Sequence, residues 1–461
     1  MTDKLTRRLD RLDGIYCLWM LFLALLYYIP FIMSIVDLVY DVSCVFGVAV
    51  IGYRLFTKQY RLDIYTILLG LFLLFYAVTA AINGGRLDEA KVWLYLAFAF
   101  FLFFSNTCQM QAVLLPRVMY LVTGFALITG IASLILFLTG TTVILTSDLT
   151  TDLGIVGIHP NGALYGLIGN SNRMSWIAIF GICSSVYLMH RHSRKPVRIL
   201  LGLHILLQFV LVVCSNSRGG ILGLCVFAVV FTFLRGKLHW SDWFKGAGAA
   251  ILVLAVLLGA YGGVKAAENV YYSSVIVPKL EQEQDTEHAS SSDHIKKQTN
   301  RSSSSMKGTF SARLDAYQAG MAMFAAHPIL GVGKEGVAEI ILDYLPESSM
   351  MIVYETTGNL HSTYITLLAS SGLAGFLVLA VFMLLHARLA FRFRRYLAFD
   401  EHLLIALLLS ILCINLFETE ILYTRTFSCF LFWFYFGVLS NELRSRQQAP
   451  DQTLAGKEIP L

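Results

Sequence analysis

Long apolar stretches recur along most of the chain and are separated by short polar connections. A bilayer span needs about 20 mostly apolar residues, and a backbone inside lipid must satisfy its own hydrogen bonds, as a helix does. The pattern therefore predicts an all-α integral membrane protein with about twelve transmembrane helices. The predicted spans are residues 16–36, 38–53, 64–82, 92–107, 119–138, 174–190, 199–217, 219–235, 246–264, 364–386, 403–417 and 426–440.

One long connection, residues 265–360, interrupts the series between the ninth and tenth spans. Its middle part, 281–309, is almost entirely polar and buries too little apolar surface to offset the entropy of ordering. We therefore predict that this part is disordered and that deleting residues 285–305 is tolerated. Order is expected to return at Ser311, a residue type that caps helices, and apolar positions at helical spacing predict an amphipathic helix over 311–326.

Two other segments carry local signals. Residues 139–173 are rich in Gly, Thr and Asn, and are interpreted as a segment that folds back into the membrane. Gly331-Val-Gly-Lys-Glu-Gly336 has the spelling of a dinucleotide-binding loop, but that loop requires a strand before it and a βαβ unit around it. A flexible turn after Pro328 is the better interpretation.

Lysine and arginine are concentrated in alternate connections, as expected of the cytoplasmic loops of a multi-pass protein. A basic run also precedes the first span, so both termini are predicted to be cytoplasmic. The resulting organisation places about nine spans in residues 1–264 and a large extracytoplasmic loop over 265–360. The remaining spans then lie in 361–440, and residues 441–461 form a cytoplasmic tail.

Composition matters mainly for the classes of protein that it excludes. Of the 461 residues, 57% are hydrophobic and 14% are charged, which is not a soluble globular composition. The net charge of +5 comes from basic residues scattered over the loops, so no nucleic-acid partner is predicted. The eight cysteines lie in or beside spans, so no disulfide framework and no cysteine-based metal site is predicted. The span cores have almost no ionisable groups, which disfavours an ion-coupled transporter.

Three basic residues, Arg218, Arg313 and His361, lie beside spans on the predicted outer face. The planar fork of arginine suits phosphate oxygens, so two arginines on one face are interpreted as a site for a lipid diphosphate. His361 is a candidate to take a proton from an attacking hydroxyl. Each residue also has a structural interpretation, because arginines snorkel at membrane interfaces and a histidine can hydrogen-bond a helix start.

Further polar side chains share the predicted outer face. Asn170 and Asn172 either bind sugar hydroxyls or cap the following helix, and the pattern fits both roles. Glu418, Glu420 and Arg425 lie together between the last two spans, where an internal ion pair is the favoured interpretation.

Several segments together resemble the O-antigen ligase and polymerase superfamily. Ser217-Arg-Gly-Gly220 resembles its Ser-Arg-Gly element, and Gly169-Asn-Ser-Asn172 resembles its Gly-Asn-x-Asn entry to a middle span. Arg313 followed by the Pro-x-x-Gly-x-Gly pattern of 328–333 is similar to the family's loop segment. His361-Ser-Thr-Tyr364 is similar to its His-Asn-x-Tyr segment.

The resemblance covers residues 160–385 and has two departures. Ser362 stands where the family usually has asparagine, and Tyr317 stands near a position that is often tryptophan. The resemblance implies a GT-C-like helical fold and a metal-independent, inverting glycosyltransferase without a cofactor. It also implies a bacterial inner-membrane location, a donor glycan carried on polyprenyl (undecaprenyl) diphosphate, and a glycan or lipid acceptor on the outer face.

Roles for individual residues follow from the same resemblance. Arg218 and Arg313 would bind the diphosphate and offset the charge of the leaving group, and His361 would orient or deprotonate the acceptor hydroxyl. The residues implied to bind substrate are Asn170, Asn172, Arg173, Ser217, Gly219, Tyr317 and Tyr364.

Alternatives remain open at this point. A polysaccharide polymerase shares the donor and the fold but uses another lipid-linked repeat as acceptor, and a protein O-glycosyltransferase would use a serine or threonine hydroxyl. A flippase or transporter of lipid-linked glycans also needs many spans and basic residues, but it forms no new glycosidic bond.

Overall fold

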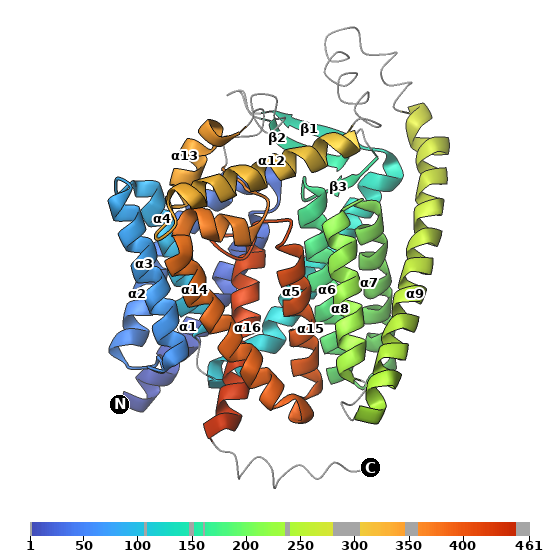
Figure 1. The fold of residues 1–461 in the computed structure, drawn as a ribbon. Coiled ribbons are helices and arrows are strands. Elements are labelled where there is room, and N and C mark those ends of the chain that lie inside the picture. The colour runs from blue at the N-terminus through green and yellow to red at the C-terminus, as the bar shows by residue number, and fades with distance from the viewer. Residues whose placement is uncertain are drawn as a thin grey trace.

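The computed structural model describes residues 2–105, 108–146, 152–159, 162–235, 240–279, 305–345 and 358–448. Within these ranges the protein is a bundle of long helices with one small sheet (Figure 1). The start of the first helix and the end of the last one lie at one end of the bundle, which we call the termini end. The sheet and two outer helices, α12 Ser305–Ala326 and α13 Lys334–Tyr344, lie at the opposite end, which we call the sheet end.

Every predicted span overlaps a helix of the structure. By length and composition, seven of the described helices are apolar enough to cross a membrane, so the chain is an all-α membrane protein as predicted. These seven are Pro30–Phe56, Ile64–Ile82, Met110–Thr139, Lys195–Cys214, Arg218–Arg235, Phe244–Lys279 and Thr363–Arg392.

The first part of the chain forms five α-helices and two short irregular helices. Pro30 divides the first two long helices, because it starts a 3-10 turn over Pro30–Ile32. The first span therefore ends earlier than predicted, and the second begins before residue 38. The elements are α1 Thr2–Leu26, η1 Pro30–Ile32, α2 Met33–Phe56, α3 Ile64–Ile82, α4 Leu87–Ala97, the π-helix η2 Phe98–Phe104 and α5 Cys108–Thr139.

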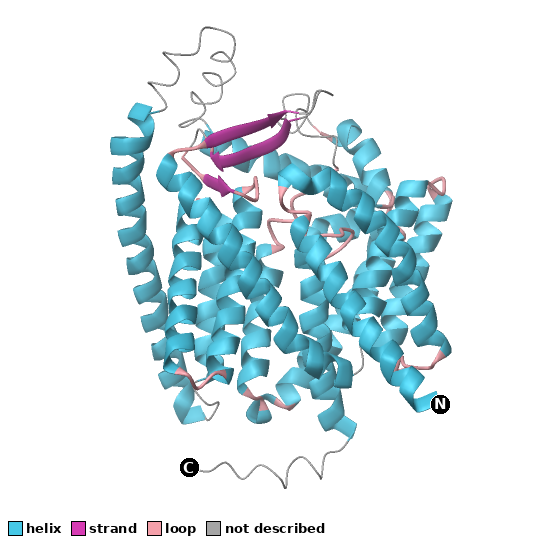
Figure 2. Cartoon of the chain, turned by 180° about the vertical axis from the view of Figure 1, so that it is seen from behind, coloured by secondary structure: helices cyan, strands magenta, loops and turns pink. Residues whose placement is uncertain are grey.

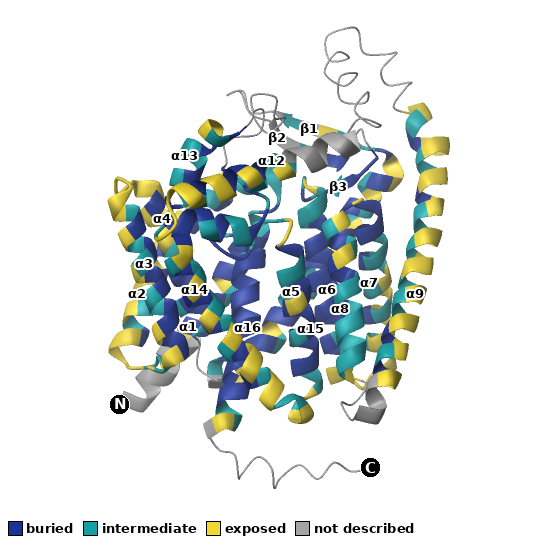
Figure 3. Cartoon of the chain, in the orientation of Figure 1, coloured by how far each residue is buried: buried dark blue, intermediate teal, exposed yellow. Residues whose placement is uncertain are grey.

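The middle of the chain forms a second group of long helices. They are α6 Ser171–Arg191, α7 Lys195–Cys214, α8 Arg218–Arg235, α9 Trp240–Tyr271 and the short π-helix η3 Tyr272–Ile276. Helix α9 packs on α8 and, less extensively, on α7, and most of its surface is exposed, with 6% of the apolar window in Phe244–Lys279 buried (Figure 3). An apolar helix that is this exposed is suited to contact with lipid.

The last part of the chain contains the outer helices and three long helices. They are α12 Ser305–Ala326, α13 Lys334–Tyr344, α14 Thr363–Arg392, η6 Arg394–Tyr396, α15 Phe399–Ile414 and α16 Phe427–Gln448. The extracytoplasmic loop was predicted to be disordered over 281–309. Residues 280–304 lie outside the described residues, whereas 305–309 form the first turns of α12. Helix α12 therefore begins before Ser311, where the sequence predicted its start.

Helix α12 includes the amphipathic helix predicted over 311–326. Of the apolar positions whose spacing predicts this helix, Leu314 and Met321 are 42% and 44% exposed. The buried face consists of Met323 and the small residues Ala316, Ala319 and Gly320, and a Cβ on Gly320 would lie 2.5 Å from Ile365 Cγ2 of α14. Small side chains thus let α12 approach α14 closely, which the hydrophobic periodicity alone does not reveal.

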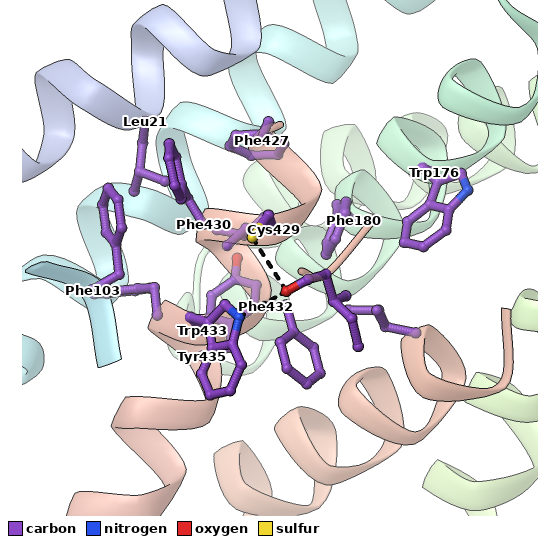
Figure 4. Close-up of a cluster of buried hydrophobic side chains, with 14 of the residues drawn as sticks. Leu21, Phe103, Trp176, Phe180, Phe427, Cys429, Phe430, Phe432, Trp433 and Tyr435 are labelled. Carbon is purple, nitrogen blue, oxygen red and sulfur yellow. Dashed lines mark hydrogen bonds between the residues drawn. The ribbon is translucent and has the colours of Figure 1, made fainter. Parts of the chain in front are cut away.

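Helix α16 lies at the centre of the bundle (Figure 3, Figure 4). Its aromatic residues are almost fully buried, and Trp433 donates a hydrogen bond from Nε1 to Ile421 O at 2.9 Å. The Cys429 thiol contacts the same carbonyl oxygen at 3.3 Å, as drawn in Figure 4. These bonds tie α16 to the connection that precedes it. Residues 441–448 continue the helix where a tail was predicted, and 449–461 lie outside the described residues.

A small antiparallel sheet covers the sheet end over α5 and α6 (Figure 2). Its strands are β1 Thr142–Thr146, β2 Asp152–Ile158 and β3 Leu164–Gly166, in the order β1-β2-β3. Thr142 pairs with Gly157, and Ile158 pairs with Leu164. The segment predicted to fold back into the membrane is therefore a sheet at the end of the bundle. Threonine and β-branched residues in β1 and β2 explain its strands.

Helix α14 is broken at Gly372, and another segment of the chain supplies hydrogen-bond partners for the backbone groups at the break. Gly372 has φ 59° and ψ −164°, which interrupts the helical hydrogen bonds. Residues 328–333, which follow α12, lie across the gap and bond the freed backbone groups. These bonds are Val332 N to Ala369 O (2.9 Å), Gly333 N to Ser370 O (3.0 Å), Leu373 N to Pro328 O (2.8 Å) and Ala374 N to Ile329 O (3.0 Å).

The Pro-x-x-Gly-x-Gly pattern of 328–333 thus has a structural role in holding α12 and α14 together. A Cβ on Gly331 would lie 2.5 Å from Ala369 O, and Gly331 and Gly333 both have positive φ angles. Immediately after them, the buried carboxylate of Glu89 accepts hydrogen bonds from Glu335 N (2.8 Å) and Gly336 N (3.3 Å) at the start of α13. Among the described residues on either side of this segment there is no βαβ unit, so the dinucleotide interpretation has no support.

Candidate functional site

Polar side chains from segments far apart in the sequence meet at the sheet end. They come from the start of α6, the turn between α7 and α8, helix α12, the residues before α14, and the connection between α15 and α16. Glu418, in the last of these connections, lies at their centre. Its Oε1 accepts hydrogen bonds from Asn172 Nδ2 at 2.6 Å and from Arg313 Nη2 at 3.3 Å.

Asn172 connects Glu418 to the turn before α8. Its Oδ1 accepts a hydrogen bond from Ser217 Oγ at 2.8 Å, and Ser217 Oγ in turn accepts one from Gly220 N at 3.1 Å. A Cβ on Gly220 would lie 2.4 Å from Ser175 Oγ, so glycine is needed for this close approach. The Ser-Arg-Gly-Gly element therefore docks on α6 and orients Asn172 towards the carboxylate.

Asn170 and Arg173 have separate roles beside this line of hydrogen bonds. Asn170 caps α6, because its Oδ1 accepts from Asn172 N (3.0 Å) and Arg173 N (3.1 Å). The capping interpretation is thus the one that the structure supports for Asn170. The guanidinium of Arg173 lies 5.3 Å from the ring centroid of Tyr28, and it interacts electrostatically with Glu418 and Glu420.

His361 lies close to Arg313 in the stretch before α14. Its φ of 50° is unusual for a residue with a side chain, and its backbone N donates to Asn359 Oδ1 at 2.9 Å. The ring Nδ1 is buried and has no hydrogen-bond partner among the described residues. Burial, together with the nearby Arg313 cation, lowers the pKa of His361 to about 4. The imidazole is therefore neutral at physiological pH.

Tyr317 and Tyr364 stabilise the backbone around this site. Tyr317 donates from its hydroxyl to His361 O (3.2 Å) and Leu416 O (3.1 Å), so it ties α12 to the two loops that carry His361 and Glu418. Tyr364 donates to Leu412 O at 2.9 Å. Both hydroxyls are bound to carbonyl oxygens, which is a structural role.

The structure brings Arg313, His361, Asn172, Arg173 and Ser217 into one cluster. Within the described residues, the Arg218 side chain has no hydrogen bond or ion pair with this cluster. Arg218 is exposed at the first turn of α8, and it neighbours Ser217 in the chain. Gly219 is half-buried, and a Cβ there would be 3.6 Å from Ile414 Cγ2, so the backbone does not require glycine at this position.

The predicted grouping of Glu418, Glu420 and Arg425 separates into different contacts. Arg425 pairs with Asp37 and, at 3.4 Å, with Asp41 of α2, and its guanidinium lies 4.7 Å from the ring centroid of Tyr27. Glu420 is buried near Arg173, and burial raises its pKa. Glu418 pairs with Arg313, which is 105 residues away in the chain. Local charge spacing therefore identified the residues of this loop without identifying their partners.

Comparison with known proteins agrees with the predicted relationship. Residues 203–380 match a family model described as O-Antigen ligase. The matched region contains Ser217, Arg218, Arg313, Tyr317 and His361, and it ends before the connection that carries Glu418. No curated protein matches the chain. The resemblance to the O-antigen ligase and polymerase family is therefore confirmed over this region.

Proposed function

We propose, because residues 203–380 match the O-antigen ligase family, that the protein is a membrane glycosyltransferase acting on a lipid-linked glycan. The donor is a glycan on polyprenyl (undecaprenyl) diphosphate, and the acceptor is a glycan or lipid at the sheet end of the bundle. In this proposal the sheet end faces away from the cytoplasm, in the inner membrane of a bacterium, and both chain termini are cytoplasmic. A ligase is favoured because the family model is that of a ligase.

The observation that carries the proposal is the position of Arg313. Its side chain is 29% exposed, lies at the sheet end, and has the Glu418 carboxylate as its ion-pair partner at 3.3 Å. An arginine held in this way keeps donors available for a second anion. Its neighbours His361 and Asn172 supply further polar groups beside it, as a site for a diphosphate and a sugar requires.

The chemistry follows from the charges that develop during transfer. The acceptor oxygen attacks the anomeric carbon from the side opposite the diphosphate, which inverts the configuration at that carbon. Negative charge grows on the departing diphosphate, and Arg313, with Arg218 reaching in from the start of α8, offsets it. His361 orients or deprotonates the acceptor hydroxyl. The polyprenyl tail lies against the exposed apolar helices, among which α9 is the most exposed. The residues of the site supply this chemistry without a metal ion.

The first experiment removes the protein from its cell and analyses the lipid-linked glycans that accumulate, by gel and mass spectrometry. Long polymers left on polyprenyl diphosphate are expected for a ligase, and rescue by the wild-type gene but not by Arg313→Ala ties the effect to the site. Single repeat units on the lipid would instead identify a polymerase. Unchanged lipid-linked glycans would contradict glycosyl transfer from this donor.

A further inference from the structure

We infer that Glu418 is the group that takes the proton from the acceptor hydroxyl, and that His361 orients the acceptor. This inference rests on the proposed glycosyl transfer. It assigns a catalytic role to a carboxylate that lies outside the family-matched residues 203–380.

The geometry of Glu418 is that of an oriented carboxylate with one oxygen available. Both of its side-chain hydrogen bonds go to Oε1, from Asn172 on α6 and from Arg313 on α12. Within the described part of the chain, Oε2 receives no hydrogen bond. It is also not fully buried. The side chain is 13% exposed. Oε2 is therefore the oxygen that a bound hydroxyl can approach.

The connection between α15 and α16 holds this carboxylate in place through its backbone. Thr363 N, at the start of α14, donates to Glu418 O at 2.9 Å and to Asn415 O at 3.0 Å. The Thr363 hydroxyl donates to Asn415 Oδ1 at 2.6 Å. Because Thr363 follows His361 by two residues, these bonds fix Glu418 and His361 relative to each other, as catalysis by two groups requires.

Electrostatics give the carboxyl group a basicity suited to proton transfer at neutral pH. Burial raises the pKa of Glu418 to about 7. The positive charges of Arg313 on α12 and Arg173 on α6 lower this pKa, and the negative charge of Glu420 in the same loop raises it. A general base works best when its pKa lies near the working pH. Burial and the same Arg313 lower the pKa of His361 to about 4, so the imidazole is a weaker base than the carboxylate.

His361 remains suited to a positioning role. It is neutral at physiological pH, and a neutral imidazole has one ring nitrogen that donates and one that accepts. Its Nδ1 is buried without a partner among the described residues, beside Arg313.

The proposed step balances as follows. The acceptor proton moves to Glu418 Oε2 while the acceptor oxygen forms a bond to the anomeric carbon. The bond from that carbon to the diphosphate oxygen breaks, and its electron pair leaves with the diphosphate, which gains one negative charge. Glu418 then releases the proton to water and returns to its ionised form.

Transfer in a reconstituted system tests the inference, with the natural acceptor compared to sodium azide. Azide is already an anion and needs no base, so it reports on donor activation alone. We expect Glu418→Gln to lower kcat for the natural acceptor by about 10²–10⁴-fold, while glycosyl azide forms at a rate within about threefold of wild type. Glu339→Gln is the matched control, because it also removes a carboxylate paired with an arginine (Arg86) at the sheet end, and it should leave both rates unchanged.

The pH dependence of the wild-type protein provides a second test that needs no variant. Glu418 must be ionised to act, so kcat for the natural acceptor should rise with pH through about 7 and then level off. Formation of glycosyl azide should lack this rise. A base at His361 would place the rise near pH 4 instead.

Two results would overturn the assignment. If Glu418→Gln keeps wild-type transfer to the natural acceptor, another group takes the proton. If Glu418→Gln loses transfer to azide as well, the carboxylate serves only to hold Arg313. Failure of the proposed function looks different, because the wild-type protein would then form neither product from a polyprenyl diphosphate donor.

Discussion

Replacement of Gly372 by alanine tests the link between the fold and the site. At this residue α14 is broken, with φ 59° and ψ −164°, a conformation that costs a non-glycine residue about 1–3 kcal/mol. The added Cβ would lie 2.4 Å from Ile329 O and 2.6 Å from Leu330 N. Both atoms belong to the backbone of the segment 328–333, so the clash is relieved only if that segment moves.

Movement of this segment breaks two hydrogen bonds, from Leu373 N to Pro328 O and from Ala374 N to Ile329 O. Each is worth about 0.5–1.5 kcal/mol, so Gly372→Ala should lower the free energy of unfolding by about 2–6 kcal/mol in total. Because residues 328–333 follow the helix that carries Arg313, glycosyl transfer should also fall.

The assay is thermal unfolding of the purified protein in detergent, followed by intrinsic fluorescence, together with the transfer rate. Gly124→Ala is the matched control, because Gly124 lies in α5 with no atom within 4 Å of an added Cβ. Alanine there should be neutral or stabilising by about 0.5–1 kcal/mol. If Gly372→Ala unfolds at the wild-type temperature and transfers glycan at the wild-type rate, the proposed bridge between α12 and α14 has no energetic importance.

Three further predictions concern the site and the core. Arg313→Ala should abolish transfer while the protein still inserts and elutes as a single species, and Arg313→Lys should have little activity because lysine lacks the planar fork of arginine. Full activity in both variants would show that Arg313 is not part of the site. His361→Asn and His361→Ala should both lose activity, but His361→Asn should be the more stable variant because asparagine tolerates the positive φ of 50°. Equal melting temperatures would show that the backbone at His361 is not strained. Arg54 and Asp13 form a buried ion pair with an Nη2–Oδ1 distance of 2.5 Å, so Arg54→Met should destabilise the protein by about 3–5 kcal/mol because it leaves the buried Asp13 carboxylate without its cation. A stability close to wild type would show that the fold does not need this pair.

The membrane fold was largely predictable because hydrophobic periodicity and span length are direct consequences of the bilayer. Boundaries were less predictable where a local residue acted against the pattern, as Pro30 does between α1 and α2. The sheet at 142–166 was missed, because its strands are short and the segment is rich in glycine. The start of α12 was also missed, because the polar composition of 305–309 indicated disorder.

The sequence singled out Arg313 and His361 as candidates, but it did not identify the partners of Glu418. Arg313 and His361 were singled out because the predicted topology places both on the outer face and because their segments resemble motifs of the O-antigen ligase and polymerase superfamily. The role of Glu418 depends on Arg313 and Asn172, which lie in distant parts of the chain and meet it only in the fold. No spacing rule in the sequence reports such a contact. The contribution of Arg218, which is exposed at the start of α8, remains a prediction.

The measurement that tests the central claim most directly is transfer by the purified protein in liposomes that contain a polyprenyl diphosphate-linked glycan and an acceptor. The account predicts a new glycosidic bond to the acceptor, release of polyprenyl diphosphate in an equal amount, and loss of both products in Arg313→Ala. If the lipid-linked glycan instead crosses the bilayer intact and no polyprenyl diphosphate is released, the protein is a transporter and the proposed function is wrong.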